Sequence, residues 1–131
     1  MDTARQRMVA EQLRDRGIHD PAILTAFAQV PRHLFVSRAY AESAYADAPL
    51  PIPAGQTISQ PYVVAYMIEI LALQPEDRVL EIGTGSGYAA AILSHLVDEV
   101  YTVERHPELV AFAQENWARA GYAQKIGRAH V

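Results

Sequence analysis

The sequence contains no cysteine, which excludes disulfide bonds, thiolate metal ligands and a cysteine nucleophile. It also lacks any apolar run close to the roughly 20 residues that a membrane-spanning helix needs. The opening stretch, MDTARQRMVAEQLRDRG, is too rich in charge for a secretory signal. We therefore expect a cytoplasmic protein that binds no metal and does not contact a membrane.

Basic residues are few, and Lys125 is the only lysine. Lys and Arg number 11 against 15 Asp and Glu, the formal net charge is −4 and the pI is near 5.7. Proteins that bind nucleic acid usually show a basic patch or a high pI, so we expect no nucleic-acid partner. Apolar residues, in contrast, make up 50% of the 131 residues, which is enough for one domain with a core of moderate size.

The first half of the sequence predicts helices followed by an irregular segment. Apolar residues recur at helical spacing over residues 3–16, and a second helix should begin at Pro21 and end at Pro31. Prolines alternate with other residues within 40–56, which favours extended or turn backbone and forbids a central strand. Residues 1–60 are therefore expected to form a helical and loop extension.

The second half predicts an α/β core. Helices are expected over residues 61–73, 87–96 and 107–120, and strands over 78–82 and 99–103. This order of strands and helices is typical of a parallel sheet with right-handed crossovers, and the apolar residues of the first strand favour its burial. Residues 61–124 are thus expected to form the first βαβ half of a Rossmann-like core.

A glycine-rich loop separates the first predicted strand from the next helix. The dinucleotide-binding fingerprint GxGxxG would use Gly83 and Gly85, but its third glycine falls on Tyr88. Gly87 comes one residue too early for that pattern. The stretch EIGTGSG, residues 81–87, instead resembles the ExGxGxG loop of class I methyltransferases that bind S-adenosylmethionine. Glycines in such a loop let the backbone approach the amino-acid part of the ligand closely.

Acidic residues in and after the loop fit the same ligand. A carboxylate at Glu81 suits the ammonium and sulfonium groups of S-adenosylmethionine. The helix N-terminus after Gly87 favours the carboxylate of the ligand. Glu104 follows the second predicted strand, where an acid in α/β nucleotide sites accepts hydrogen bonds from ribose hydroxyls. Gly83 and Glu104 both follow the carboxyl ends of strands, so we expect one site there.

A second distinctive stretch is GQTISQP, residues 55–61. Thr57 and Ser59 lie just before a predicted helix, and composition alone favours helix capping for both. The order of PRHLFV, YAD, PLPI, GQTISQPYVVAYM, VLEIGTGSGY and VYTVER, however, resembles the protein-L-isoaspartate (D-aspartate) O-methyltransferase family. The resemblance runs from about Gln6 to Tyr122, and TISQP is highly specific to the family.

The resemblance implies a fold, a reaction and a site. The fold is that of class I S-adenosylmethionine-dependent methyltransferases, with a Rossmann-like parallel sheet. The reaction transfers a methyl group from S-adenosyl-L-methionine to the carboxyl group of L-isoaspartyl residues in damaged proteins and peptides. The ester then collapses to a succinimide, which reopens partly to aspartate. Ser59 matches the active-site serine, and the positions that match cofactor-binding residues are Thr57, Ile58, Ser59, Gln60, Glu81, Gly83, Thr84, Gly85, Ser86, Gly87, Glu104 and Arg105.

The implied chemistry needs no general base. The acceptor carboxylate has an ordinary pKa near 4 and is already ionised at pH 7. The enzyme must instead orient the carboxylate in line with the methyl group, and the hydroxyl of Ser59 could do so by hydrogen bonding. We interpret the scattered histidines His19, His33, His95 and His106 as structural or surface residues.

The resemblance also predicts that residues 1–124 are a truncated methyltransferase domain. Family members are longer, so the third and later strands, the adenine-binding loop and the substrate side are expected to be missing. Residues 125–131, which contain the only lysine, are predicted to be a non-native tail. Strand 78–82 would then form an apolar edge, and we expect the chain to be poorly soluble or inactive. A full-length protein is expected to be monomeric.

Three other interpretations stay open. The chain could belong to another class I methyltransferase, or to a fragment of a NAD-binding Rossmann oxidoreductase, which Tyr88 disfavours. It could also be a binding module that keeps only part of a cofactor site. Calorimetry with S-adenosylmethionine, S-adenosylhomocysteine and NAD separates the methyltransferase from the oxidoreductase.

Overall fold

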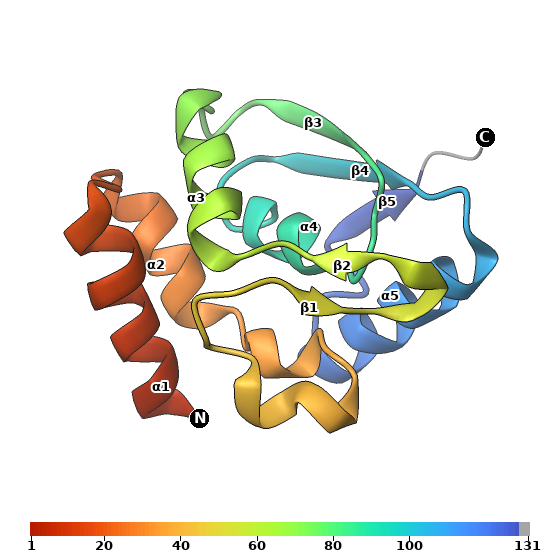
Figure 1. Cartoon of the computed structure of the whole chain (residues 1–131). Helices are drawn as coiled ribbons and strands as arrows, with labels where there is room; N and C mark the ends of the chain where they lie inside the picture. The colour runs from red at the N-terminus through yellow and green to blue at the C-terminus, as the bar shows by residue number, and fades with distance from the viewer. Residues whose placement is uncertain (129–131) are drawn as a thin grey trace.

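The computed structural model describes residues 1–128 (Figure 1). Its helices are α1 (Asp2–Arg7), α2 (Pro21–Gln29), α3 (Pro61–Ile70), α4 (Tyr88–Leu93) and α5 (Pro107–Ala120). Its strands are β1 (Leu50–Pro51), β2 (Thr57–Ile58), β3 (Arg78–Ile82), β4 (Glu99–Val103) and β5 (Ile126–Arg128). Figure 1 shows α1 and α2 on one side of the molecule and the sheet of β3, β4 and β5 on the other. Among the described residues, none of the helices combines the length and apolar character needed to cross a membrane.

The N-terminal helices form where the sequence predicts them. α1 continues through further helical turns as far as Arg16, and Gly17 follows in the left-handed conformation at φ +102°. Asp20 caps α2 by accepting a hydrogen bond from the backbone N–H of Ala22 at 2.9 Å. Phe27 of α2 is fully buried, so this helix contributes directly to the core.

The segment between α2 and α3 contains more regular structure than the sequence predicts. Short 3-10 helices cover Arg32–Leu34 and Arg38–Ser43. β1 pairs antiparallel with β2, with Leu50 opposite Ile58, and this small sheet is separate from the main one. Pro51 has no N–H to donate to a ladder, which is consistent with a strand of only two residues.

The main sheet is parallel, with the strand order β3–β4–β5. α4 connects β3 to β4 and α5 connects β4 to β5, so each connection is a strand–helix–strand crossover. The pairing of β3 with β4 runs from Arg78 opposite Glu99 to Ile82 opposite Val103. The α/β order that the sequence predicts is therefore confirmed for these elements.

The third strand departs from the sequence prediction. No third strand was expected, and residues 125–131 were predicted to be a non-native tail, whereas β5 pairs with β4. Ile126 is buried, and a Cβ atom on Gly127 would lie 2.8 Å from ring carbons of Tyr101. The small residue allows the backbone of β5 to approach its neighbour closely. Residues 129–131 lie outside the described residues, and the non-native origin of the tail stays a prediction.

One hydrophobic core joins the N-terminal extension to the sheet. The ring of Tyr88 in α4 packs edge-on against Phe27 and Phe35, at centroid distances of 5.9 and 5.7 Å. Leu109 and Trp117 from α5 are buried in the same core. Residues from α2, from the irregular segment and from the crossover helices thus stabilise one another.

One face of the sheet and one face of α3 expose apolar side chains. Leu80 and Ile82 of β3 are 55% and 76% exposed, and Met67 and Ile70 of α3 are 59% and 63% exposed. The predicted burial of β3 is wrong for this face, because β3 is an edge strand and no described element covers these side chains. The predicted apolar edge is confirmed, and such an edge favours pairing with other chains.

We predict that Leu80→Lys reduces self-association of the chain, because a charge on an exposed edge strand opposes pairing between edges. Size-exclusion chromatography with light scattering over a concentration series should give a lower average mass than for the unchanged protein. The control is Glu76→Gln, which makes the same change in net charge at an exposed turn and should leave association unaltered. Equal association of the Leu80→Lys variant and the unchanged protein would argue against the edge as the cause.

Candidate functional site

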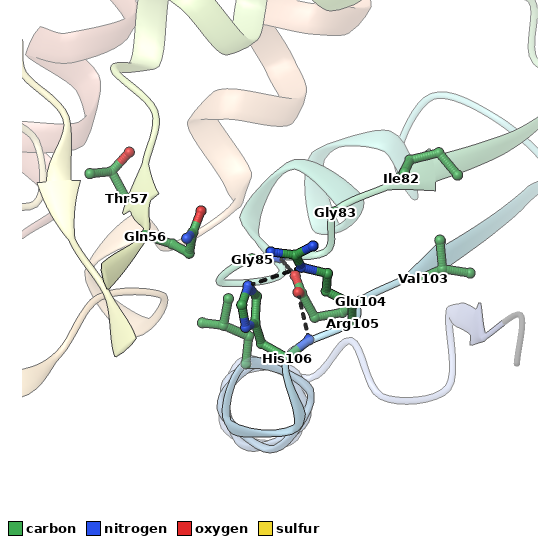
Figure 2. A pocket seen from close by; sticks show the side chains of 10 residues that line it. Gln56, Thr57, Ile82, Gly83, Gly85, Val103, Glu104, Arg105 and His106 are labelled. Atoms are coloured by element: carbon green, nitrogen blue, oxygen red, sulfur yellow. Dashed lines mark hydrogen bonds between the residues drawn. The ribbon is translucent and has the colours of Figure 1, made fainter. Parts of the chain in front are cut away.

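The carboxyl ends of β3 and β4 open onto a cleft of about 860 Å³. Ile82 ends β3 opposite Val103, which ends β4, so the loops that follow both strands begin at the same edge of the sheet. Figure 2 shows Gln56 and Thr57 on the opposite side of the cleft from these two residues. The residues that line the cleft are Gln56, Thr57, Ile82, Gly83, Gly85, Val103, Glu104, Arg105, His106 and Leu109. A cleft of this size can hold a small-molecule ligand.

The glycine loop is tied by its backbone to the end of β4. The N–H groups of Gly83 and Thr84 both donate to the carbonyl of Val103, at 2.8 and 3.1 Å. Gly83, Gly85 and Gly87 have φ values of +95°, +57° and +87°, which favour glycine. A Cβ atom on Gly83 would meet no described atom within 4 Å, so its backbone is open to a ligand in the cleft.

Glu104 lines the cleft and joins the glycine loop to the start of α5. One carboxylate oxygen accepts a hydrogen bond from the N–H of Gly85 at 2.9 Å, and the other accepts one from the N–H of His106 at 3.0 Å (Figure 2). A carboxylate has about four lone-pair positions, so each oxygen can accept a further bond from a ligand. Arg105 follows with an exposed side chain that also lines the cleft.

Glu81 is part of a hydrogen-bonded chain of side chains that reaches the loop. The hydroxyl of Thr102 donates to a carboxylate oxygen of Glu81 at 2.9 Å and lies 2.6 Å from the hydroxyl oxygen of Thr84. Burial raises the pKa of Glu81 to about 7, the hydrogen bond from Thr102 opposes this rise, and the charge of Glu104 adds to it. Glu81 therefore changes its charge close to neutral pH.

The last residues of the loop pack against α5. The carbonyl of Gly87 accepts a hydrogen bond from the indole N–H of Trp117 at 2.9 Å, and the carbonyl of Ser86 accepts one from the amide of Asn116 at 2.9 Å. The buried hydroxyl of Ser86 also accepts from the N–H of Tyr88 at 3.2 Å. Ser86 and Gly87 thus support the loop from its core side and do not line the cleft.

The segment of residues 57–60 reaches the cleft through Thr57. Ile58 is buried, Ser59 is exposed, and Gln60 donates a hydrogen bond to the carboxylate of Asp47 at 2.6 Å. The helix-capping interpretation of Thr57 and Ser59 is wrong, because Gln60 is the N-cap of α3 and no side chain makes a capping hydrogen bond there.

The cleft brings together part of the predicted cofactor site. The predicted residues that line it are Thr57, Gly83, Gly85, Glu104 and Arg105. The other predicted residues do not line the cleft but lie close to the lining residues in the sequence. They are Ile58, Ser59, Gln60, Glu81, Thr84, Ser86 and Gly87. Within residues 1–128, no three His, Asp or Glu side chains lie close enough together to hold a metal ion.

Sequence reasoning missed some residues of the site. Ile82 and Val103 line the cleft as the last residues of predicted strands, and the rule that ligands bind at strand carboxyl ends could have indicated them. His106 lines the cleft beside Glu104, although it was interpreted as a structural or surface residue. The sequence did not indicate a role for Thr102 in the site, because threonine is common within strands.

Comparison with known proteins agrees with the geometry. The sequence model of the family described as protein-L-isoaspartate(D-aspartate) O-methyltransferase matches residues 4–129. The chain belongs to this family. The match includes the N-terminal extension as well as the glycine loop, and it does not favour a NAD-binding oxidoreductase.

Members of the family from several bacteria are similar over most of this chain. A protein-L-isoaspartate O-methyltransferase of Pelobacter propionicus is 59% identical over 118 residues, which are 90% of this chain and 52% of the relative. One of Herpetosiphon aurantiacus is 57% identical over 118 residues, which are 90% of this chain and 53% of the relative. The chain therefore spans about half the length of the curated relatives that it matches.

Solved structures of the family share the fold. A protein-L-isoaspartate O-methyltransferase superposes with a TM-score of 0.83 at 30% identity, over 95% of this chain and 41% of that one. A family structure from Plasmodium falciparum, in complex with S-adenosyl-L-homocysteine, gives 0.82 at 27% identity, over 97% of this chain and 62% of that one. The fold is thus an incomplete class I methyltransferase fold with a Rossmann-like parallel sheet and a helical extension.

We predict that Glu81→Gln flattens the dependence of stability on pH. Folding raises the pKa of Glu81 from 4.5 to about 7, so its contribution to stability is complete below pH 4.5 and is lost as the pH rises through about 7. The contribution is at most roughly 3 kcal/mol. Thermal unfolding followed by circular dichroism from pH 4.5 to 7 should show a smaller fall in Tm for the variant. Glu108→Gln, at an exposed carboxyl group of α5, is the control, and an unchanged slope for Glu81→Gln would refute the assignment.

We predict that Gly87→Ala destabilises the chain by roughly 3 kcal/mol or more, because it combines backbone strain with overpacking. Gly87 has φ +87°, and an added Cβ atom would lie 2.6 Å from Nε1 of Trp117. Gly17→Ala is the matched control, since Gly17 has φ +102° but its Cβ would meet no described atom within 4 Å. The Gly17→Ala substitution should lower the free energy of unfolding by only about 1 kcal/mol. Urea unfolding measures the free energy of unfolding of both variants. Equal losses of stability in Gly87→Ala and Gly17→Ala would show that the contact with Trp117 is unimportant.

Proposed function

We propose that this chain carries the cofactor-binding half of a protein-L-isoaspartate O-methyltransferase. The proposed reaction transfers a methyl group from S-adenosyl-L-methionine to the carboxyl group of L-isoaspartyl residues in damaged proteins and peptides. The observation that carries the proposal is the glycine loop and Glu104 lining one cleft in a chain of this family. The Plasmodium falciparum relative in complex with S-adenosyl-L-homocysteine supports the choice of ligand.

The residues of the cleft fit S-adenosyl-L-methionine. Gly83 would admit the amino-acid part of the ligand, because its left-handed backbone is open to the cleft. Glu104 would accept hydrogen bonds from the ribose hydroxyls with the lone pairs that Gly85 and His106 leave available. Thr57 lies across the cleft and would border the ligand. The cofactor, when bound, supplies an electrophilic methyl group.

The other predicted cofactor-binding residues would support the site through charge, through the shape of the loop or at the edge of the cleft. Glu81, ionised above its raised pKa of about 7, would attract the cationic groups of the ligand. Thr84, Ser86 and Gly87 would hold the loop in shape through their bonds to β4 and α5. Arg105 would border the ligand from the cleft edge.

Ser59 is the proposed residue for orienting the acceptor carboxylate. Its side chain is exposed and lies two residues after Thr57, which lines the cleft. The buried Ile58 and the bond from Gln60 to Asp47 hold this segment on both sides of Ser59. The carboxylate needs orientation and no general base, because it is already ionised at pH 7.

The native part of the chain, its cellular location and its oligomeric state are also proposed. Residues 1–124 would be the native part of a longer methyltransferase domain, a proposal supported by the relatives, of which this chain spans only about half the length. Residues 125–131 would be a non-native tail, which the single lysine in that segment supports. The lack of cysteine supports a cytoplasmic location, and the full-length protein would be a monomer.

We predict that Glu104→Gln weakens binding of S-adenosylhomocysteine by about tenfold or more, because a hydrogen bond to a charged acceptor is replaced by one to a neutral amide. Isothermal titration calorimetry measures the affinity, and unfolding curves establish that the variant is folded. Glu108→Gln makes the same change in charge outside the cleft and should bind normally. The proposal fails if the unchanged chain binds NAD more tightly than S-adenosylhomocysteine, or if Glu104→Gln binds with full affinity.

A further inference from the structure

Arg32 is completely buried, which is unusual for an arginine. Its Nε donates to the carbonyl of Ala44 at 2.6 Å, and one terminal nitrogen donates to the carbonyl of Ser59 at 3.0 Å. Among the described residues, no Asp or Glu forms an ion pair with it. A buried cation without a carboxylate partner is costly, so its contacts with backbone carbonyls need a reason.

The same guanidinium contacts the residue that follows the glycine loop. Its Cζ lies 4.9 Å from the ring centroid of Tyr88, which directly follows Gly87. Burial lowers the pKa of Arg32 and the nearby Tyr88 opposes this, while an arginine still keeps its charge. Arg32 therefore joins the backbone of Ser59 to the helix that begins at the end of the glycine loop.

Hydrogen bonds hold both neighbours of Ser59 in place. The pairing of β1 with β2 ends at Ile58, and the side chain of Gln60 is held by Asp47. Between these two restraints, the bond from Arg32 to the carbonyl of Ser59 is the one hydrogen bond that Ser59 makes within the described residues. An apolar side chain could fill the space of Arg32, but it could not hold this carbonyl.

We propose that Arg32 is a positioning residue that fixes the backbone of Ser59 relative to the glycine loop. Arginine suits this task because its planar fork donates in fixed directions to separate acceptors and its face packs on an aromatic ring. A lysine can donate to one or both carbonyls but lacks that geometry. The functional part of this inference rests on the proposed role of Ser59, whereas the restraint on its backbone does not.

The test compares Arg32→Met, Arg32→Lys and a control, Arg38→Met, which changes an exposed arginine of the same region. NMR order parameters report the backbone at Ser59. We expect about 0.85 in the unchanged chain and a fall toward about 0.6 in Arg32→Met, with Arg32→Lys between them. Order parameters in α2 and α5 should stay unchanged. The Arg38→Met variant should match the unchanged chain throughout.

Two results would overturn the inference. The first is an order parameter at Ser59 that stays at its original value in Arg32→Met. The second is an equal loss of order at Ser59 and in α2 and α5, which indicates a general contribution to folding. If Arg32→Met does not fold, Arg32→Lys decides between the same outcomes.

Titration with S-adenosylhomocysteine separates this inference from the proposed function. Arg32 does not line the cleft, so Arg32→Met should bind the ligand as Arg38→Met does. Failure of the unchanged chain to bind would reject the proposed function, and the order parameters at Ser59 would still decide the role of Arg32. Loss of binding in Arg32→Met alone would contradict a role confined to the segment of Ser59.

Discussion

The carbonyl of Val103 is the acceptor on which the site depends. It receives the N–H groups of both Gly83 and Thr84, so the first turn of the glycine loop is attached to the last residue of β4. The in-register pairing of β3 with β4 makes this possible, because it places Ile82 beside Val103. Glu104, the next residue, then lies within reach of Gly85. One strand pairing thus fixes the glycine loop and Glu104, which line the sheet side of the cleft.

Polar groups buried near the cleft give the site its shape at a cost in stability. Glu81 accepts a hydrogen bond from Thr102 at a buried position, where burial disfavours the ionised carboxylate. Arg32 is buried against the carbonyl of Ala44 and the ring of Tyr88. Both connect segments that are distant in the sequence, such as the loop of Ser59 and the start of α4.

The sequence predicted those parts of the fold and site that depend on local pattern. Gly83 and Glu104 could be placed at one edge because strand ends and parallel order follow from periodicity and turn residues. The contacts of Arg32 and Thr102 could not be predicted, since they depend on how separate segments pack. The strand at Ile126 was missed because residues 125–131 were predicted to be a non-native tail, and three residues carry too little pattern to indicate a strand.

The central claim is that the glycine loop and Glu104 bind S-adenosylmethionine or its product. A titration of the ¹⁵N-labelled chain with S-adenosylhomocysteine, followed by amide chemical shifts, tests it most directly. The account predicts that the largest shift changes occur at Gly83, Gly85 and the residues around Glu104, with none of similar size on the exposed face of α3. Saturable binding with its largest changes away from the cleft, or no binding, would contradict it.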